Sequence, residues 1–523
     1  MKKNYLIAIV VAAVLIGLSL FSSGDDNGKE FSTSVRGLTE AKPSQVIELK
    51  DGDVYNLTAS FVKKNINGNM VRMLAYNGSI PGPTLKVAQG SKITINFKNN
   101  TDLANTIHWH GLRVKNEFDG VPDVTQKIVP VGGSFAYTLT FPDAGAYWYH
   151  PHVRDDYTIE MGLYGGIVVL PNEGSSWNKV DREEMVFVDD ILLQNDILAP
   201  FGKDGATRAL MGRYGNTMFV NGETSYSLNI KKGEVVRFYF TNSANASPFN
   251  LAIEGVKMKL VGGDSGLYER DTWVDAVMIN PSERAIVEVL FDKAGEYALQ
   301  NKTPDAIYTM GKITVSNEQI ISSSAKSFVV LRTHPEVIKS IDQFRHSFNS
   351  PQQRRIKLSV DMMGESNMGG HMMQSGTMMG GGMGMNTGIP KGGIEWEDTD
   401  MSAMNMMSSV ASVKWNIIDQ DTGKKNMDID WAFKRGPVKI RIENDANSMH
   451  PMQHPIHFHG QRFLVVNKNG VAQTNLVWKD TVLVPAGEYV DIVLDASNPG
   501  IWMVHCHILE HIEAGMAFLF KVE

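Results

Sequence analysis

The chain has 523 residues, 43% of them hydrophobic, and a formal net charge of -7. That length exceeds what one hydrophobic core usually organises, so we expect two or three globular domains. Acidic and basic residues are mixed along the chain, and no basic stripe of the kind that neutralises phosphates is present. The charge pattern therefore argues against nucleic acid as a partner.

The N-terminus has the layout of a secretory signal. Two lysines precede an uncharged apolar run from Tyr5 to Phe21, and a polar stretch follows it. Residues 1–24 are therefore predicted to be a signal peptide or an N-terminal membrane anchor, with the protein exported to the periplasm or cell surface. The run is long for a signal peptide and short for a membrane span, so both interpretations stay open.

Most of the remaining chain has the pattern of β-strands. Short alternating runs such as Lys92 to Phe97 and Val235 to Phe240 are bounded by Gly, Pro, Asn and Asp, and helical periodicity is scarce. Alternation of this kind is typical of strands with one buried face. The sequence therefore predicts an all-β fold.

Two sequence landmarks occur three times. The first, a Gly followed by an alternating strand and an Asn, occupies 90–99, 233–242 and 436–444. The second, a Gly with an aromatic residue two positions later, starts at Gly145, Gly295 and Gly500. Repetition at this range indicates three copies of one β-sandwich unit of about 150 residues. We predict domains at 44–172, 180–320 and 325–523.

The three copies differ in two places. The third copy is longer by about 55 residues, and its segment 361–407 is rich in Gly, Ser, Asn and Met without periodicity, which predicts a mobile loop. The middle copy has Gln300 where the outer copies have His150 and His505. We expect the middle domain to be a spacer without metal ligands.

Ten of the 14 histidines fall in four short windows. The windows are His108-Trp109-His110, His150-Pro151-His152, His454-Pro455-Ile456-His457-Phe458-His459, and His505-Cys506-His507 with His511. Residues two apart on a strand share a face, so each His-x-His pair can place two imidazoles at metal-binding distance. One such pair is weak evidence, but four windows indicate a metal centre.

The only cysteine, Cys506, lies in the last window and cannot form an intramolecular disulfide. With His511 and Met516 it forms a Cys-x4-His-x4-Met loop, which His454 can join from another strand. Two imidazoles, a thiolate and a weak axial thioether are the ligands of a blue-copper site. The two histidines that flank Cys506 face the other side of an extended backbone, so one segment can link two sites.

The four windows, in this order, resemble the copper-binding signatures of multicopper oxidases, a family that includes laccases and bacterial cuprous oxidases. The resemblance implies three cupredoxin-like Greek-key β-sandwich domains, four coppers per chain, and reduction of dioxygen to water by electrons that enter at the blue copper. The implied ligands are His454, Cys506, His511 and Met516 for type 1 copper, His108 and His457 for type 2, and His110, His150, His152, His459, His505 and His507 for the type 3 pair.

Reduction of dioxygen to water consumes protons, which an acid near the cluster should deliver. Asp119 resembles the relay carboxylate of the family, and we predict it to be catalytic. A second relay acid commonly follows the last blue-site histidine in related enzymes, but this chain has Ile512 there. Either the next residue, Glu513, substitutes through water, or proton delivery depends more on Asp119.

The methionine-rich segment 361–407 bears on the electron donor. Thioethers bind Cu(I) well, and the tract resembles the insert of bacterial cuprous oxidases, which implies oxidation of Cu(I) in copper tolerance. Candidate substrate-binding residues are Asp361, Met362, Met363, Met372 and Met452. The alternative is laccase-like oxidation of phenols and aromatic amines. The expected partners are dioxygen and Cu(I) or a small organic reductant, and the expected oligomeric state is a monomer.

Two other classes of protein share some of these features. In a non-enzymatic copper buffer the methionines would sequester Cu(I) and the sandwiches would be scaffold, but such relatives lose copper ligands and this chain has the full set. A copper nitrite reductase has the blue site but would not need the additional His pairs.

Overall fold

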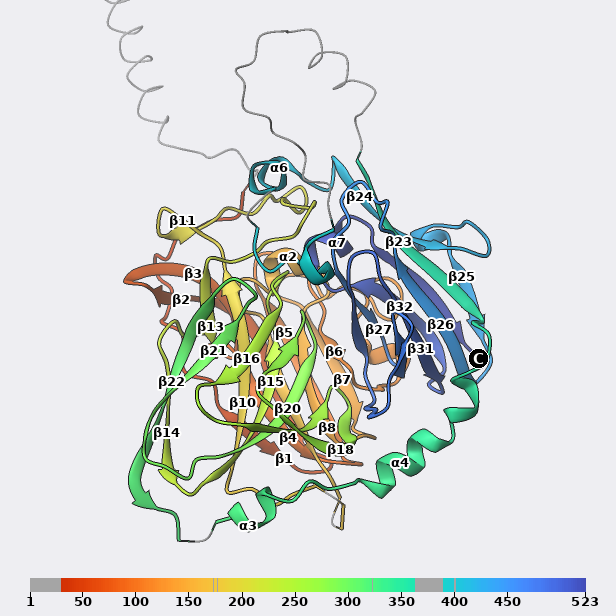
Figure 1. Cartoon of the computed structure of the whole chain (residues 1–523). Coiled ribbons are helices and arrows are strands. Elements are labelled where there is room, and N and C mark those ends of the chain that lie inside the picture. The colour runs from red at the N-terminus through yellow and green to blue at the C-terminus, as the bar shows by residue number, and fades with distance from the viewer. Residues whose placement is uncertain (1–29, 173, 176, 322, 363–388, 399–400) are drawn as a thin grey trace, which may run out of the picture.

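The computed structural model describes residues 30–172, 174–175, 177–321, 323–362, 389–398 and 401–523 (Figure 1). Strands dominate these residues and form six large sheets, each built from strands of one third of the chain. The all-β prediction is confirmed. The domain boundaries 44–172, 180–320 and 325–523 stay predictions.

The first third contains a five-stranded sheet, β1-β4-β9-β8-β6, and a four-stranded sheet, β3-β2-β5-β7. Its elements are β1 (Val46–Leu49), β2 (Val54–Ile66), β3 (Asn69–Tyr76), β4 (Gly82–Ala88), β5 (Lys92–Asn100), β6 (His108–His110), η1 (Asn116–Phe118), β7 (Ser134–Thr140), β8 (Gly145–His150), α2 (Asp155–Thr158) and β9 (Gly165–Leu170).

The middle third contains a six-stranded sheet, β13-β10-β15-β20-β17-β18, and a five-stranded sheet, β14-β22-β21-β16-β19, with a small β11-β12 pair. Its elements are β10 (Arg182–Ile191), β11 (Leu193–Gln194), β12 (Ile197–Leu198), β13 (Thr217–Val220), β14 (Tyr226–Lys232), β15 (Val235–Asn242), β16 (Phe249–Ile253), β17 (Met258–Gly263), β18 (Gly266–Val274), β19 (Val277–Ile279), β20 (Arg284–Leu290), β21 (Gly295–Lys302) and β22 (Ile307–Gln319).

The last third contains a six-stranded sheet, β24-β23-β26-β31-β28-β29, and a five-stranded sheet, β25-β33-β32-β27-β30. Its elements are α3 (Ala325–Phe328), α4 (Pro335–Asp342), η2 (Arg345–Ser347), β23 (Arg354–Met362), η3 (Lys391–Gly393), α6 (Ser402–Met407), β24 (Val413–Asp419), η4 (Asn426–Asp428), β25 (Asp430–Phe433), β26 (Gly436–Asn444), β27 (His454–Phe458), β28 (Arg462–Lys468), β29 (Val471–Ala472), β30 (Thr481–Val484), β31 (Tyr489–Ala496), β32 (Gly500–Cys506), α7 (Leu509–Glu513) and β33 (Ala517–Val522).

The Asn of the first landmark has the same structural role in all three copies. Asn99, Asn242 and Asn444 are buried, and each donates its side-chain amide to two backbone carbonyls at 2.7–3.1 Å. The acceptors are Leu103 and Val129 for Asn99, Ser247 and Ile279 for Asn242, and Met452 and Val484 for Asn444. Because β27 starts at His454, the third of these residues fixes the entry to a strand that carries histidines.

Each of the three largest hydrophobic clusters is centred on one copy, but two of them extend into other parts of the chain. The cluster of the first third also takes in Phe187, Ile191, Leu198, Phe201, Phe219 and Leu509. The cluster of the last third also takes in Ala209, Leu210, Met211 and Tyr214 from the middle third. Burial of these side chains joins the two parts of the chain by apolar contact. In Figure 1 the middle third (green) and the last third (blue) lie side by side, with the N-terminal third (orange) behind them.

The segment 361–407 is only partly a loop. Asp361 and Met362 end β23, residues 363–388 and 399–400 lie outside the described residues, and α6 lies near the end of the segment. Asn405 of α6 accepts a hydrogen bond from Met211 N at 3.0 Å and donates one to Gly212 O at 2.9 Å. The expectation of a loop throughout is wrong here, because contacts with distant residues stabilise a helix that local periodicity does not indicate.

Within the described residues, no helix combines the length and the apolar character that crossing a membrane requires. The predicted signal peptide or anchor at 1–24 lies outside these residues.

Candidate metal centre

Paired strands bring the four histidine windows together. In the first third, β6 pairs antiparallel with β8 so that His108 lies opposite His150. In the last third, β27 pairs antiparallel with β32 so that His457 lies opposite His505. Side chains two apart share a face of a strand, so each register places several imidazoles on one side of its sheet.

Cys506, His454 and His511 form one compact group. The Cys506 Sγ lies 3.6 Å from Nδ1 of each histidine, and the two Nδ1 atoms are 3.3 Å apart. Three ligands arranged trigonally about 2.1 Å from one ion would be separated by about 3.6 Å, so these atoms fit a single metal ion. Met516 is buried in the same core cluster, and its carbonyl accepts a hydrogen bond from Cys506 N at 3.1 Å.

Burial of these three side chains favours metal binding. All three side chains are at most 1% exposed. Burial raises the pKa of the Cys506 thiol, and lowers that of His454 to about 3. The imidazoles are therefore neutral, with a lone pair available, and a bound cation would displace the thiol proton. Ile508 N donates a hydrogen bond to Cys506 Sγ at 3.4 Å, which supports negative charge on sulfur.

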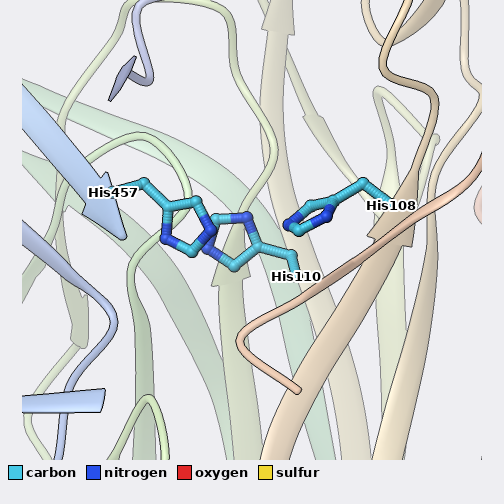
Figure 2. Close-up of side chains that lie close together, drawn as sticks. All are labelled: His108, His110 and His457. Carbon is cyan, nitrogen blue, oxygen red and sulfur yellow. The ribbon is translucent and has the colours of Figure 1, made fainter. Parts of the chain in front are cut away.

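The other eight histidines of the four windows gather in a second buried site. Ligand atoms within 4.8 Å of one another define three groups of histidines: His110 with His150 and His507, His152 with His459 and His505, and His108 with His110 and His457. A fourth group, His108 with Asp119 and His459, connects the second to the third. Figure 2 shows the third group, with His110 and His457 from different thirds of the chain facing each other; their ring centroids are 3.7 Å apart. The first and last thirds of the chain thus complete the site together.

Most of these imidazoles have one nitrogen fixed by the protein and the other directed into the cluster. Nδ1 of His108 donates to Asp119 O at 2.8 Å, and Nδ1 of His457 donates to Asp480 O at 2.9 Å. Nε2 of both is buried without a hydrogen-bond partner, as is Nε2 of His152. Buried polar atoms normally have partners, and a fixed second nitrogen is typical of metal-bound histidine. The residues therefore fit a group of metal ions.

Burial also keeps this cluster neutral. It lowers the pKa of the imidazoles of His110, His150, His152, His457, His459, His505 and His507. Neutral imidazole is the form that binds metal.

Asp119 bridges two histidines of the cluster. Its buried carboxylate accepts a hydrogen bond from His459 Nδ1 at 2.9 Å, and its other oxygen lies 3.4 Å from His108 Nδ1. The next residue, Gly120, has φ +92°, and a Cβ there would lie 2.1 Å from Ile107 O. Only glycine fits this turn. The predicted catalytic residue therefore lies in contact with the cluster, where a carboxyl group could exchange protons.

Asp480 and Arg284 belong to the site although the sequence did not indicate them. Asp480 accepts a hydrogen bond from His110 Nε2 at 3.0 Å and is itself held by Arg284, whose Nη1 donates to Oδ1 at 2.7 Å. Burial raises the pKa of Asp480, but Arg284 and its hydrogen bonds hold it well below the usual value. Arg284 is the first residue of β20, so the middle third contributes to the site and is more than the predicted spacer. None of its described residues is among the possible metal ligands named above. No local motif marks either residue.

The acids after the last histidine window lie close to a further carboxyl group. Burial raises the pKa of Glu510 and of Glu513 to about 7. Glu513 accepts a hydrogen bond from Asp155 N at 3.3 Å, and the Asp155 carboxylate lies 3.6 Å from His152 Nδ1. Asp155 therefore lies between Glu513 and the cluster.

Of the predicted substrate-binding residues, Asp361, Met362 and Met452 lie within the described part of the chain. The Asp361 carboxylate accepts hydrogen bonds from Asn416 Nδ2 at 2.9 Å and Lys425 Nζ at 3.2 Å. Met452 is fully buried in the core that contains Cys506. Met362 ends β23, and Met363 and Met372 lie outside the described residues.

Comparison with known proteins defines the class. Models of multicopper oxidases match residues 59–174, 196–322 and 397–523. Multicopper oxidase MmcO of Mycobacterium tuberculosis is 27% identical over 495 residues, covering 88% of this chain and 85% of that protein. Copper resistance protein A of Escherichia coli is 24% identical over 577 residues, covering 90% and 93%. The solved structure of a Campylobacter jejuni multicopper oxidase, a metallo-oxidase, has a TM-score of 0.65 at 23% identity and covers 94% of this chain and 99% of its own.

The chain belongs to the multicopper oxidase family. It is an oxidoreductase with copper cofactors, and its three units are cupredoxin-like β-sandwiches. The family uses dioxygen together with copper or organic reductants. Bound copper supplies one-electron redox chemistry, and the protein supplies neutral imidazoles, a thiolate and the fixed hydrogen bonds that orient them.

Proposed function

We propose that this oxidase is an exported cuprous oxidase that takes electrons from Cu(I) in copper tolerance. In this proposal the four coppers have the ligands inferred from the sequence. They are His454, Cys506, His511 and Met516 for type 1, His108 and His457 for type 2, and His110, His150, His152, His459, His505 and His507 for the type 3 pair. The separation into one three-atom group and one eight-histidine cluster supports this assignment.

The low exposure of the blue-site histidines is the observation that favours Cu(I) as the electron donor. His454 is 1% and His511 0% exposed. The Trp415 ring stacks on His511 with centroids 4.2 Å apart, and its Nε1 donates to Ala209 O at 2.8 Å. A bulky phenol has no imidazole edge to contact, whereas a small cation can dock beside the site and pass an electron through the protein.

The similarity to Copper resistance protein A of Escherichia coli and the methionine-rich sequence after Asp361 support the same choice. The test is steady-state dioxygen consumption by one preparation of the four-copper enzyme, with Cu(I) or a phenol as donor. A kcat/KM for Cu(I) well above that for the phenol is expected. The reverse order would contradict the proposal.

Laccase-like oxidation is the second candidate, and one cavity favours it. A cavity of about 760 Å³ is lined in part by Tyr214, Tyr308 and Trp396, and aromatic walls suit aromatic donors. Tyr214 OH accepts a hydrogen bond from Gln453, the neighbour of His454, at 3.1 Å. Laccase-3 of Oryza sativa is 26% identical over 514 residues, covering 86% of this chain and 88% of that protein.

Asp119 is the catalytic residue of the proposal, as a proton relay to the cluster. Its hydrogen bond to His459 and its contact with His108 support this role. The second relay position holds Ile512, and the contact of Glu513 with Asp155 supports the substitution of Glu513 for the missing acid.

Export follows from the N-terminal sequence, with residues 1–24 acting as a cleaved signal or a retained membrane anchor. N-terminal sequencing of the exported protein separates the two, because only cleavage removes Met1. We further propose a monomer, and a mass near 57.9 kDa or slightly less in solution is the expected result.

A further inference from the structure

His450 is a buried histidine outside both copper groups, four residues before His454. It is 7% exposed, and its Nε2 has no hydrogen-bond partner among the described residues. Nε2 lies 3.9 Å from Oε1 of Glu395. Burial lowers the pKa of His450 to about 4, so at neutral pH the imidazole is uncharged. The 3.9 Å separation equals two metal–ligand distances of about 2 Å, so a neutral imidazole and a carboxylate in these positions could bind one ion between them.

Glu395 also lines a cavity of about 340 Å³. The cavity wall includes two further carboxylates and two thioethers, with one lysine as the opposing charge. These residues are Asp305, Glu397, Met211, Met401 and Lys391. Excess negative charge attracts a cation, and thioether sulfur favours a soft one. The lining therefore suits Cu(I) better than it suits an anion.

A short hydrogen-bonded path leads from Glu395 to the blue site. Glu395 N donates to Gln453 Oε1 at 2.9 Å, and Gln453 Nε2 donates to Glu395 O at 2.9 Å. Gln453 is joined to His454 by a peptide bond. The backbone of Glu395 is thus held in a fixed position beside the residue that precedes a proposed copper ligand.

We propose that His450 and Glu395 form the site at which Cu(I) docks for oxidation, with access through the cavity beside Glu395. Each Cu(I) gives one electron, which passes by Gln453 and His454 to the mononuclear site. The ion itself then leaves as Cu(II). Four such electrons and four protons convert one dioxygen to two waters. This inference rests on the proposed cuprous oxidase function and replaces Asp361, whose carboxylate Lys425 already holds.

The experiment uses the four-copper enzyme and the variants Glu395→Gln and His450→Gln, which keep side-chain size and the Glu395–Gln453 backbone contacts. Glu296→Gln, in an exposed ion pair with Lys312, is the matched control. Two measurements are made on each protein: dioxygen consumption with Cu(I) and with 2,6-dimethoxyphenol, and binding of Ag(I), a redox-inactive analogue of Cu(I).

In each site variant we expect KM for Cu(I) to rise by about 10-fold or more, since loss even of an outer-shell partner weakens metal binding that much. The two variants should bind one equivalent of Ag(I) fewer than the wild type and the control, because the methionines of 363–388, which all four proteins share, can also bind Ag(I). The rate of phenol oxidation should stay within about twofold of the wild-type rate, because the blue site is intact.

Several outcomes would overturn the proposal. Unchanged KM for Cu(I) and unchanged Ag(I) binding in both variants would exclude the site, and an equal loss with the phenol would indicate damage to the blue site instead. A raised KM in Asp361→Asn but not in Glu395→Gln would place the docking carboxylate at Asp361. Failure of the wild type to oxidise Cu(I) would reject the proposed function, whereas Ag(I) binding tests the site independently.

Discussion

Arg284 and Asp480 meet in a fully buried, two-pronged ion pair that joins the middle third of the chain to the last. Asp480 in turn accepts the Nε2 hydrogen of His110 from the first third. One carboxylate therefore ties all three parts of the chain together at the edge of the histidine cluster. Arg284 also donates to Ala146 O at 3.0 Å, which adds a second contact with the first third.

Replacement of Arg284 by Leu should destabilise the protein by about 3–5 kcal/mol, because Asp480 would be left buried and unpaired. The eight-histidine cluster should lose copper before the blue site does, since His110 and His457 depend on Asp480 for their orientation. Copper stoichiometry, the type 2 EPR signal and the copper–thiolate absorption measure the two sites separately.

Arg284→Lys keeps the charge and should restore part of the stability and of the EPR signal. Parallel loss of copper from both sites in Arg284→Leu, with no recovery in Arg284→Lys, would mean that Arg284 supports only the overall fold.

Cys506→Ser should abolish the intense visible absorption of a copper–thiolate bond and all turnover. The eight-histidine cluster should still load copper, because Cys506 belongs only to the group with His454 and His511. Absorption spectra and copper content test this. Retained oxidation of organic donors by the variant would show that the mononuclear site had been assigned wrongly.

Asp119→Asn should retain all four coppers but slow turnover, roughly 10²-fold if the carboxyl group relays protons. Asn can still accept the hydrogen bond from His459, so geometry should be preserved. The defect should grow as pH rises, because the variant depends on protons from bulk water, which become scarce. The measurement is kcat of variant and wild type from acidic to alkaline pH, with copper content checked at each pH. A variant profile that runs parallel to the wild-type profile would show that Asp119 does not relay protons.

Deletion of residues 363–388 should lower Cu(I) oxidation at limiting copper and leave phenol oxidation unchanged or faster. The segment holds eight methionines, which offer soft ligands for Cu(I), and none of the proposed copper ligands. The cut spares β23 and α6, so the copper sites should load normally. Rates with both donors at low and saturating copper provide the measurement.

A matched variant changes those eight methionines to Gln and keeps the length of the segment. If it reproduces the deletion, the thioethers are responsible. Equal loss of both activities at normal copper content would favour a structural role, and no change in either variant would mean that the segment is a passive linker.

The sequence by itself determined the all-β fold and the kinds of ligand. The His-x-His pairs and the Cys506-His511-Met516 spacing could be recognised because strand alternation and a short loop are local properties of the chain. The cofactor class followed from the ligand set, since a thiolate with two imidazoles and a thioether suits few metals other than copper.

The tertiary structure decided how the histidines are grouped and what surrounds them. His110 and His457 share a site only because the first and last thirds dock. The Arg284–Asp480 pair and the stacking of Trp415 on His511 likewise join residues that are far apart in the chain. Helix α6 and the contact between Glu395 and His450 also depend on residues far apart in the chain. Local periodicity carries no signal for such contacts, because side chains from different sheets are brought together by packing of the folded units.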